Sequence, residues 1–480
     1  MTRFIPLLAL LTTACDNPDE LPDPLDDASA GVDVMPETDG GEHRWSEEAG
    51  SLSLSETLSS STMQTTTSGP WELRATEHSM ERSAHSHYGS SDGIALKSMP
   101  DSFSLDMEES IPMSDVSEPF SGSGQQAGSL RAGATDDNAH FDAYLRYLDT
   151  QGERFGSGAM TLDVRGRQTI QALAPDGSPL PGARVSIVHP ETDTLVWTAR
   201  TQGDGRAPFY PALAVDGYHA AGSTPAGGWI VQVEKDGVFQ SQRWRGLDSE
   251  LDVTVDATSA PPAVDVCFII DTTGSMGDEI ARVKQTLLSV TEKLRADGDV
   301  DLRYGAVLYR DIGDEYVTKT HAFTTDIAGF DQALNSIQAR GGGDGPESLN
   351  QGMAVAVSEL SWRPDAARLA FLIADAPPHM DYQDDVTYGR SALAAIHHGI
   401  RIHTVAASGL DDRGSMVFRQ VAQLSGGEFI FIEYGSVAAA AADHGVSAPV
   451  GSNNLDDIIY KRIHRELVGW GHDGDAISAR

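Results

Sequence analysis

A carboxylate and two hydroxyls stand at the end of one continuous apolar run in this sequence. It lies in the stretch Val264–Met276, which reads V-D-V-C-F-I-I-D-T-T-G-S-M. The run ends abruptly at Asp271, and Thr273 and Ser275 follow at offsets of two and four. An uninterrupted apolar run of this length is typical of a buried parallel strand, so the three polar residues would lie in the turn at its carboxyl end. Their oxygens are hard ligands, which suit Mg²⁺ better than a soft metal.

Two further segments place an acidic residue in a comparable setting. The glycine-rich turn A-R-G-G-G-D-G-P-E surrounds Asp344, and a second apolar run, L-A-F-L-I-A-D, ends in Asp375. Open α/β sheets bind their ligands at the carboxyl ends of the strands. Three segments therefore each offer hard oxygen ligands, and two of these segments follow buried strands.

This combination resembles the von Willebrand factor type A family over roughly residues 262–470. That family builds its metal-ion-dependent adhesion site from three such loops, and here Thr273 stands where the family has Ser and Asp344 where it usually has Thr. The resemblance implies one bound Mg²⁺ or Mn²⁺ ion. The ligands that it implies are Asp271, Thr273, Ser275, Asp344 and Asp375.

Other interpretations of these residues stay open at this point. The two strand-terminal acids could cap the helices that follow, with the hydroxyl residues in turns. Glu347 and Asp278 fit acids of a first helical turn better than metal ligands. His379 fits the rim of the site, because imidazole is a poor partner for Mg²⁺.

The resemblance implies a non-enzymatic module that binds a protein partner at the metal-bearing edge of the sheet. An acidic residue at position 344 adds negative charge, so the ion would be held firmly but would attract a partner's carboxylate less strongly. Two alternatives follow. One is a metal-dependent hydrolase, which would need a nucleophile and base that are not legible in the sequence. The other is a structural component of an envelope complex, with a purely structural metal.

The charge of the chain excludes one class of partner. At 480 residues the formal net charge is -37, so a polyphosphate would be repelled and no nucleic-acid partner is expected. About half of this excess lies in residues 15–138, a stretch rich in Ser, Asp, Glu and Gly with no sustained period. Such a composition cannot bury enough apolar surface to fold, which predicts a disordered acidic tether.

The amino terminus resembles a bacterial lipoprotein signal peptide over residues 1–14. A basic Arg3 precedes a short apolar core, and T-T-A leads to Cys15. The core is too short to span a bilayer. The resemblance implies a lipid on Cys15 that anchors the protein to a membrane of the bacterial cell envelope; an ordinary cleaved signal is the alternative. Cys267, the other cysteine, lies in a predicted strand and suits packing, so no disulfide is expected.

Residues 139–258 carry short alternating runs separated by Pro-Gly and Asp-Gly turns, which predicts a β-sandwich. The segment D-G-S-P-L-P-G-A-R-V-S-I, with T-Q-G-D-G-R-A-P-F further on, resembles the carboxypeptidase regulatory-like, transthyretin-like sandwich. Trp229 and Trp244 fit its core better than a sugar site. The expected strands are 168–174, 183–188, 194–200, 229–235, 238–244 and 251–255.

From residue 262 onward strands and helices alternate, which predicts a doubly wound, mostly parallel sheet and an α/β, Rossmann-like fold. The expected helices are 279–294, 330–337, 349–360, 393–398, 418–424 and 455–467. Besides the two apolar runs above, the expected strands are 303–309, 400–406 and 428–432. No element is predicted for 438–451, and 471–480 is expected to be a loose tail.

Overall fold

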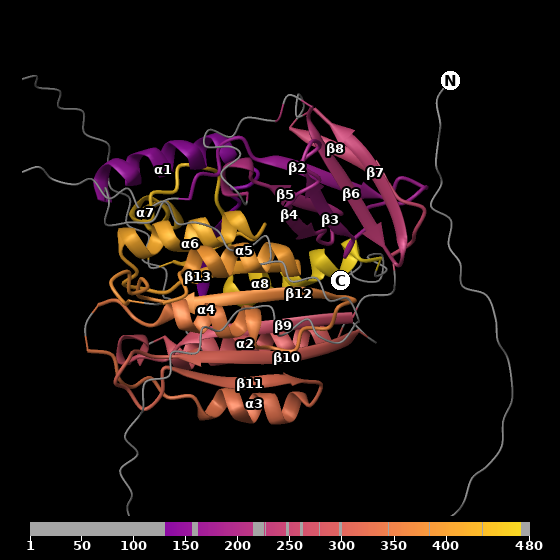
Figure 1. Cartoon of the computed structure of the whole chain (residues 1–480). Helices are drawn as coiled ribbons and strands as arrows, with labels where there is room; N and C mark the ends of the chain where they lie inside the picture. Colours follow the sequence, from indigo (N-terminus) through magenta and orange to yellow (C-terminus); the bar gives the residue numbers. More distant parts are fainter. Residues whose placement is uncertain are drawn as a thin grey trace, which may run out of the picture. The chain divides into compact units, whose positions relative to one another are not determined.

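The computed structural model describes residues 130–155, 162–214, 225, 227–245, 249–259, 263–277, 279–296, 300–343, 345–383, 385–433 and 435–471. All of them belong to one compact unit. They form an α/β unit around a large sheet and two smaller sheets (Figure 1). The predicted signal peptide with Cys15, most of the predicted tether, Asp344 and the predicted tail lie outside the described residues, except for residue 471.

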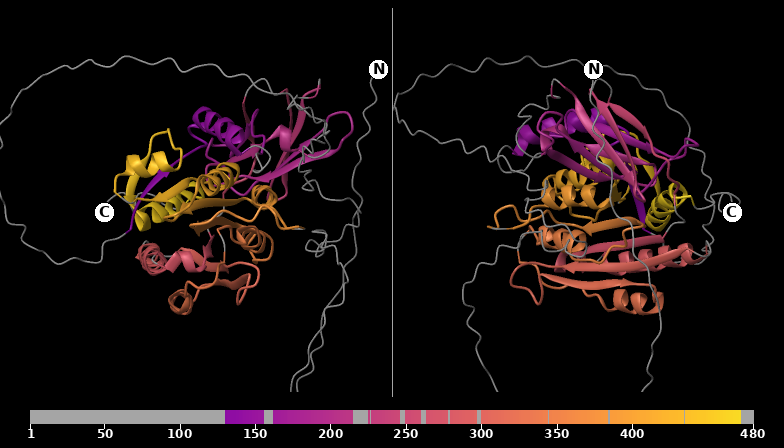
Figure 2. Two further views of the ribbon diagram at one scale, coloured as in Figure 1. Left: turned by 90° about the vertical axis from the view of Figure 1, so that its left-hand side faces the viewer. Right: turned by 45° about the vertical axis from the view of Figure 1, so that its right-hand side comes forward.

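The α/β unit is built on an eight-stranded sheet in the order β11-β10-β9-β12-β13-β14-β1-β15 (Figures 1 and 2). Strands β10, β9, β12, β13 and β14 run parallel to one another, while β11, β1 and β15 pair antiparallel. This confirms the predicted mostly parallel α/β fold. The strands are β1 (Arg131–Thr135), β9 (Ala263–Asp271), β10 (Asp301–Tyr309), β11 (Thr318–Thr324), β12 (Ala366–Ala374), β13 (Ile400–Ala406), β14 (Phe429–Ile432) and β15 (Gly451–Asn454).

Helices cover both faces of this sheet, which explains why its central strands are mostly apolar. Along β9, Val266, Phe268 and Ile270 pack with α2, α3 and α8, whereas Cys267 and Ile269 pack with α4, α5 and α6. Successive side chains of a strand point to opposite faces, so a strand covered on both faces is apolar at most positions. The helices are α2 (Ile280–Ala296), α3 (Ile327–Ser336), α4 (Leu349–Ser358), α5 (Tyr388–His398), α6 (Asp412–Leu424), α7 (Val437–Asp443) and α8 (Leu455–Gly469).

The predicted sandwich strands form two small sheets, β5-β2-β8 and β4-β3-β6-β7. Their shared core includes Trp229 and Phe209, whose rings meet edge to face at 5.3 Å. Trp229 and Trp244 are both buried, which confirms their assignment to the core. The strands are β2 (Gln168–Leu173), β3 (Arg184–Val188), β4 (Leu195–Arg200), β5 (Arg206–Phe209), β6 (Trp229–Lys235), β7 (Val238–Trp244) and β8 (Glu250–Thr254).

The predicted end of the acidic tether, residue 138, is wrong. Strand β1 lies before it, between β14 and β15, and pairs antiparallel with both. Asp137 then forms a bidentate ion pair with Arg419 of α6 at 2.7 and 2.8 Å, with both side chains almost fully buried. Gly133 is required here, because the ring of Phe431 lies 2.5 Å from where its Cβ would be. The five-residue R-A-G-A-T becomes a strand through the partners on either side of it.

The structure also contains helices and strands that the sequence analysis did not predict. Helix α1 (Phe141–Phe155) lies at the start of the region predicted as a sandwich, and it packs against α6. Its Tyr147 ring lies 3.7 Å beneath the guanidinium of Arg419. Strands β5 and β11 were also missed: β5 contains Pro208, and β11 is polar because it lies at an edge of the large sheet. Helix α7 occupies part of the segment with no predicted element.

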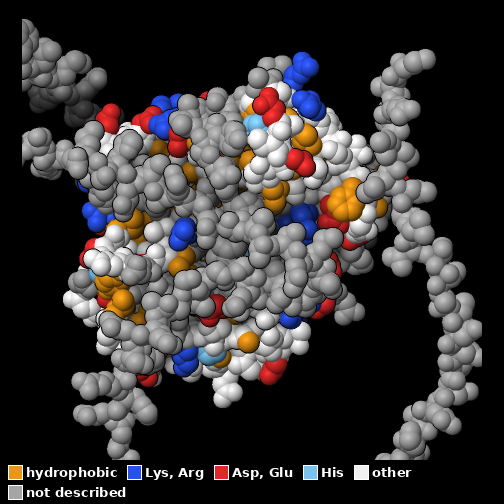
Figure 3. Space-filling model, in the orientation of Figure 1, with side chains coloured by type: hydrophobic (Ala, Val, Ile, Leu, Met, Phe, Trp, Pro, Cys, Tyr) orange, Lys and Arg blue, Asp and Glu red, His pale blue; other side chains and the backbone are white. Residues whose placement is uncertain are grey.

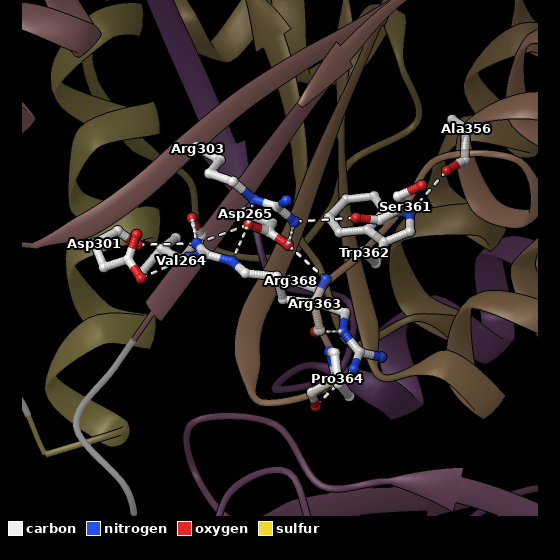
Figure 4. A network of polar contacts seen from close by, with 10 residues as sticks. All are labelled: Val264, Asp265, Asp301, Arg303, Ala356, Ser361, Trp362, Arg363, Pro364 and Arg368. Atoms are coloured by element: carbon white, nitrogen blue, oxygen red, sulfur yellow. Dashed lines mark hydrogen bonds and ion pairs between the residues drawn. The ribbon is translucent and has the colours of Figure 1, made fainter. Parts of the chain in front are cut away.

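A network of hydrogen bonds and ion pairs holds the amino end of β9 in place (Figure 4). Asp265 is fully buried and accepts two hydrogen bonds from the Arg303 guanidinium, at 2.9 and 2.7 Å. The backbone N–H and Nε of Arg363 donate to the same carboxylate at 2.8 and 2.9 Å, and Arg363 also pairs with Asp301. A buried carboxylate is tolerated when it is paired and fully hydrogen-bonded in this way. This end of β9 is opposite to the end that carries Asp271.

The surface of the described part carries both signs of charge despite the acidity of the whole chain. On the face shown in Figure 3, Lys and Arg side chains lie among Asp and Glu side chains, and the hydrophobic side chains form small separate groups.

Candidate functional site

The register of the large sheet brings the two strand-terminal acids together. Asp271 is the last residue of β9, and Asp375 directly follows β12, the parallel neighbour of β9. Ile270 lies opposite Ile373, so both strands end at the same level. The carboxyl ends of two adjacent parallel strands therefore present two carboxylates at one edge.

The loop after β9 connects these carboxylates through its hydroxyls. Thr273 donates both its backbone N–H and its Oγ1 hydroxyl to Oδ1 of Asp271, at 2.9 and 2.7 Å. The Thr273 and Ser275 hydroxyl oxygens lie 3.2 Å apart, and Ser275 Oγ donates to Oδ1 of Asp375 at 3.0 Å. Four predicted ligand residues thus form one continuous set of oxygens.

Glu347 lies in the same set, which corrects its interpretation as an acid of a first helical turn. It precedes Ser348, the N-cap of α4, and it is only 2% exposed. Its backbone is paired to the loop after β12, because its N–H donates to Pro377 O and its carbonyl accepts from the N–H of His379. Burial beside Asp271 and Thr273 gives Glu347 the surroundings of a site residue.

The glycine-rich loop passes close to Glu347 and Thr273. A side chain at Gly342, which has a φ of +74°, would place its Cβ 2.7 Å from Oε1 of Glu347 and 3.2 Å from Cβ of Thr273. Gly274 N–H donates to Gly341 O at 2.9 Å, which fixes the loop against the turn after β9. Glycine at 342 therefore lets the backbone approach the acidic oxygens closely.

Arg310 holds three of the surrounding segments in place. Its Nε donates to Thr272 O and its Nη2 to Gln338 O, while Nη1 pairs with Glu315. Its backbone carbonyl accepts from the N–H of Ser348. The Arg310 guanidinium thus connects the turn after β9, the loop after β10 and the start of the glycine-rich segment, and its backbone carbonyl holds the far end of that segment.

The electrostatics of this set are unfavourable without a cation. Burial raises the pKa of Asp271 to about 7, and the neighbouring carboxylate of Asp375 contributes to the rise. Burial also raises the pKa of Glu347 to about 8, with further repulsion from Asp271, Asp311 and Asp314. The pKa of Asp375 is raised by burial as well. Each carboxylate resists ionisation because it is buried, and Asp271 and Glu347 are also repelled by acidic neighbours.

Two buried oxygens of the site make no hydrogen bond within the described part of the chain. They are Oδ2 of Asp271 and Oε2 of Glu347. Buried carboxylate oxygens are normally paired. Carboxylates and hydroxyls together are a donor set that suits Mg²⁺ or Mn²⁺, so the residues present fit a divalent cation. Among the described residues no group of three or more His, Cys, Asp or Glu side chains could hold a metal ion by itself. In this site two of the converging residues, Thr273 and Ser275, supply hydroxyl oxygens instead.

His379 lies at the rim of the site, as expected. Its Nδ1 lies 2.8 Å from Asp381, and its ring stacks on Tyr382 at 3.9 Å. The Tyr382 hydroxyl donates to both oxygens of Asp311 at 2.9 Å. This connects the loop after β12 with the loop after β10.

Of the five predicted ligands, the structure brings together Asp271, Thr273, Ser275 and Asp375, while Asp344 lies outside the described residues. Glu347 was missed as a member of the set. The sequence placed it directly before an expected helix, and its burial depends on contacts with loops that are distant in the chain.

Comparison with known sequences identifies the domain that carries this site. The sequence model of the von Willebrand factor A domain family matches residues 265–434. These residues therefore form a von Willebrand factor A domain within the chain.

Several curated proteins are similar to part of this chain. An α-protein kinase, vwkA, of Dictyostelium discoideum is 33% identical over 134 residues, which are 28% of this chain and 21% of that protein. Human von Willebrand factor A domain-containing protein 7 is 34% identical over 141 residues, 29% of this chain and 14% of that protein. The similarity thus spans about a fifth or less of the length of these two relatives.

Two solved structures are also similar. An aerotolerance-related membrane protein from Bacteroides fragilis shares 14% identity with a TM-score of 0.29, over 43% of this chain and 99% of that one. BatB from Bacteroides thetaiotaomicron shares 15% identity with a TM-score of 0.28, over 38% and 96% of the respective chains.

Proposed function

We propose that this chain is a metal-ion-dependent protein-binding module and not an enzyme. The observation that supports this most is the pair of unpartnered, buried oxygens on Asp271 and Glu347, beside two hydroxyls at the carboxyl edge of the sheet. A divalent cation at this edge would neutralise the carboxylates and leave a coordination position for a partner. Von Willebrand factor A domains commonly take part in protein–protein interaction.

The proposed ligands are the first-loop residues Asp271, Thr273 and Ser275, together with Asp375 and Glu347. Asp344 belongs to the proposal through its place in the glycine-rich sequence motif. When bound, the cation would supply a positive charge that can hold an acidic group of the partner. The surrounding residues of this chain orient the ligand oxygens and keep water from most of them.

Partner capture should depend on the cation. Immobilised full chain is expected to retain proteins from a bacterial envelope extract in Mg²⁺ and to release them in EDTA. Asp271→Ala should lose this retention, because the cation would no longer be held. A matched control is Asp381→Asn, which changes an exposed carboxylate near the site. Equal retention in Mg²⁺, in EDTA and by Asp271→Ala would rule out binding through the metal.

The membrane location is part of the same proposal and has its own test. No helix in the described part of the chain is long and apolar enough to cross a membrane. We infer anchoring through a lipid on Cys15, from the signal-like sequence that precedes it. Cys15→Ser should move the protein from the membrane fraction to the soluble fraction of bacterial cells. Mass spectrometry of the wild-type protein that finds the intact, unmodified amino terminus would reject this anchor.

A further inference from the structure

The four-stranded sheet of the sandwich ends in β7, a strand with one paired and one unpaired edge. Among the described strands β7 pairs only with β6, in a continuous antiparallel register without a bulge. Every residue from Val238 to Arg243 is exposed, although Trp244 is buried. Phe239 is 74% exposed, more than any other large hydrophobic side chain in the described part.

Natural proteins usually protect the edges of their sheets against pairing with another chain. The other three edges of the two sandwich sheets follow this rule. Strand β4 packs against α5, where Thr198 is hydrogen-bonded to His397. Strand β5 carries Pro208, which cannot donate to a neighbouring strand, and β8 carries the acids Glu250 and Asp252.

Strand β7 has none of these protections. Its sequence V-F-Q-S-Q-R-W contains no proline, lysine or carboxylate. Arg243 is its one charged residue, and its Nη1 is occupied by a hydrogen bond to Gly227 O at 2.7 Å. Within the described part of the protein these seven residues therefore form an unpaired strand edge, although the overall charge of the chain is strongly negative.

The residues of β7 are complementary to the same strand read in reverse. An antiparallel pair centred on Ser241 places Phe239 opposite Arg243 and Gln240 opposite Gln242. Phe239 and Arg243 would form a cation–π pair, and the two glutamines can hydrogen-bond to each other. Val238 would face Trp244 at the ends. In this register all seven residues have a partner, and no like charges face each other.

We propose that β7 pairs antiparallel with β7 of a second copy of this chain, about a two-fold axis at Ser241. This joins two four-stranded sheets into one continuous eight-stranded sheet through an isologous contact. The proposal does not depend on the metal face, because β7 belongs to the sandwich. A single strand pair is small beside the roughly 800 Å² per partner of a standard interface, so the dimer should be weak and concentration-dependent.

A charge exchange at the axis tests both the dimer and its register. In the full chain, Ser241→Lys and Ser241→Glu each place two like charges opposite one another and should abolish the dimer seen by sedimentation of the wild-type protein. An equimolar mixture of the two variants should dimerise again, because each pair then joins Lys with Glu. Since residue 241 is exposed, both variants should keep the wild-type melting temperature.

The outcomes that overturn the proposal are separate from those that support it. A wild-type chain that stays monomeric at high concentration overturns it, as does a Ser241→Lys variant that dimerises like the wild type. A mixture that stays monomeric overturns the register.

Disulfide trapping gives a second readout for a weak dimer. In a Cys15→Ser background the remaining native cysteine, Cys267, is buried, so an added cysteine would be the accessible thiol of the described part. Ser241→Cys should form disulfide-linked dimers on mild oxidation, because residues opposite each other in an antiparallel pair lie within disulfide distance. Ser336→Cys, at an exposed position of α3, is the matched control. Equal dimer yield from the two variants would reject the pairing.

Discussion

Removing divalent cations from the full chain should lower its melting temperature, and adding Mg²⁺ should restore it. A ligand that binds only the folded state stabilises it by mass action, by about 2.7 kcal/mol at a hundredfold excess over Kd. For a domain of this size that corresponds to a rise of roughly 5–10 °C. A thermal melt in EDTA, followed by titration with Mg²⁺ or Mn²⁺, measures the effect directly.

Point variants should show which residues of the site are needed for the thermal response to Mg²⁺. Asp271→Ala and Glu347→Ala should each remove most of the response to Mg²⁺, because each takes away a buried oxygen that has no other partner. Asp381→Asn should keep the full response, since Asp381 is exposed at the rim. Asp344→Ala tests whether the residue that the sequence motif assigns contributes as well. A wild-type chain with no thermal or calorimetric response to any divalent ion would remove the basis for metal-dependent binding.

The response to metal should also grow as the pH rises. The pKa of Asp271 is raised to about 7 and that of Glu347 to about 8 in the folded state, mainly by burial. Without metal, the folded chain therefore holds protons that the unfolded chain has lost, and its stability falls as the pH rises from about 4 to about 8. Mg²⁺ binds the ionised carboxylates, so it should oppose this fall. Glu347→Gln should reduce the pH dependence of the metal-free protein.

A truncation that begins at residue 139 should fail to fold, whereas one that begins at residue 128 should melt cooperatively. The shorter chain lacks β1, so β14 and β15 lose the strand that lies between them. It also leaves Arg419 buried without Asp137. Removing one partner of a buried ion pair costs about 3–5 kcal/mol, a large part of the 5–15 kcal/mol that stabilises a typical protein.

A point variant separates the ion pair from the strand. Asp137→Ala leaves β1 in place and should still lower the free energy of unfolding substantially, because the Arg419 guanidinium keeps its burial and loses two hydrogen bonds. Burial raises the pKa of Asp137 in spite of Arg419, so the pair carries a desolvation cost that is tolerable only while both partners are present. Denaturant unfolding of the full chain measures the loss. Wild-type stability in both Asp137→Ala and the shorter truncation would show that β1 is dispensable.

The α/β fold and the proximity of four site residues could be predicted from the sequence alone. Central strands such as β9 carry a run of apolar residues, here Val266–Ile270, because both of their faces are covered, and this pattern is visible without a structure. Asp271 and Asp375 could be placed as well, because each follows such a strand and parallel neighbours end at the same edge. Their hydroxyl neighbours, Thr273 and Ser275, are local to the same turn.

Only the tertiary structure decided which other residues join them. Glu347 enters the site because its backbone pairs with the loop after β12, thirty residues further along the chain, and no local signal distinguishes it from an acid at a helix start. Strand β1 has no apolar run or alternation of its own; it is a strand because β14 and β15 supply hydrogen-bond partners on both sides. Periodicity reports which face of an element is buried, whereas contacts between distant segments decide which edges meet.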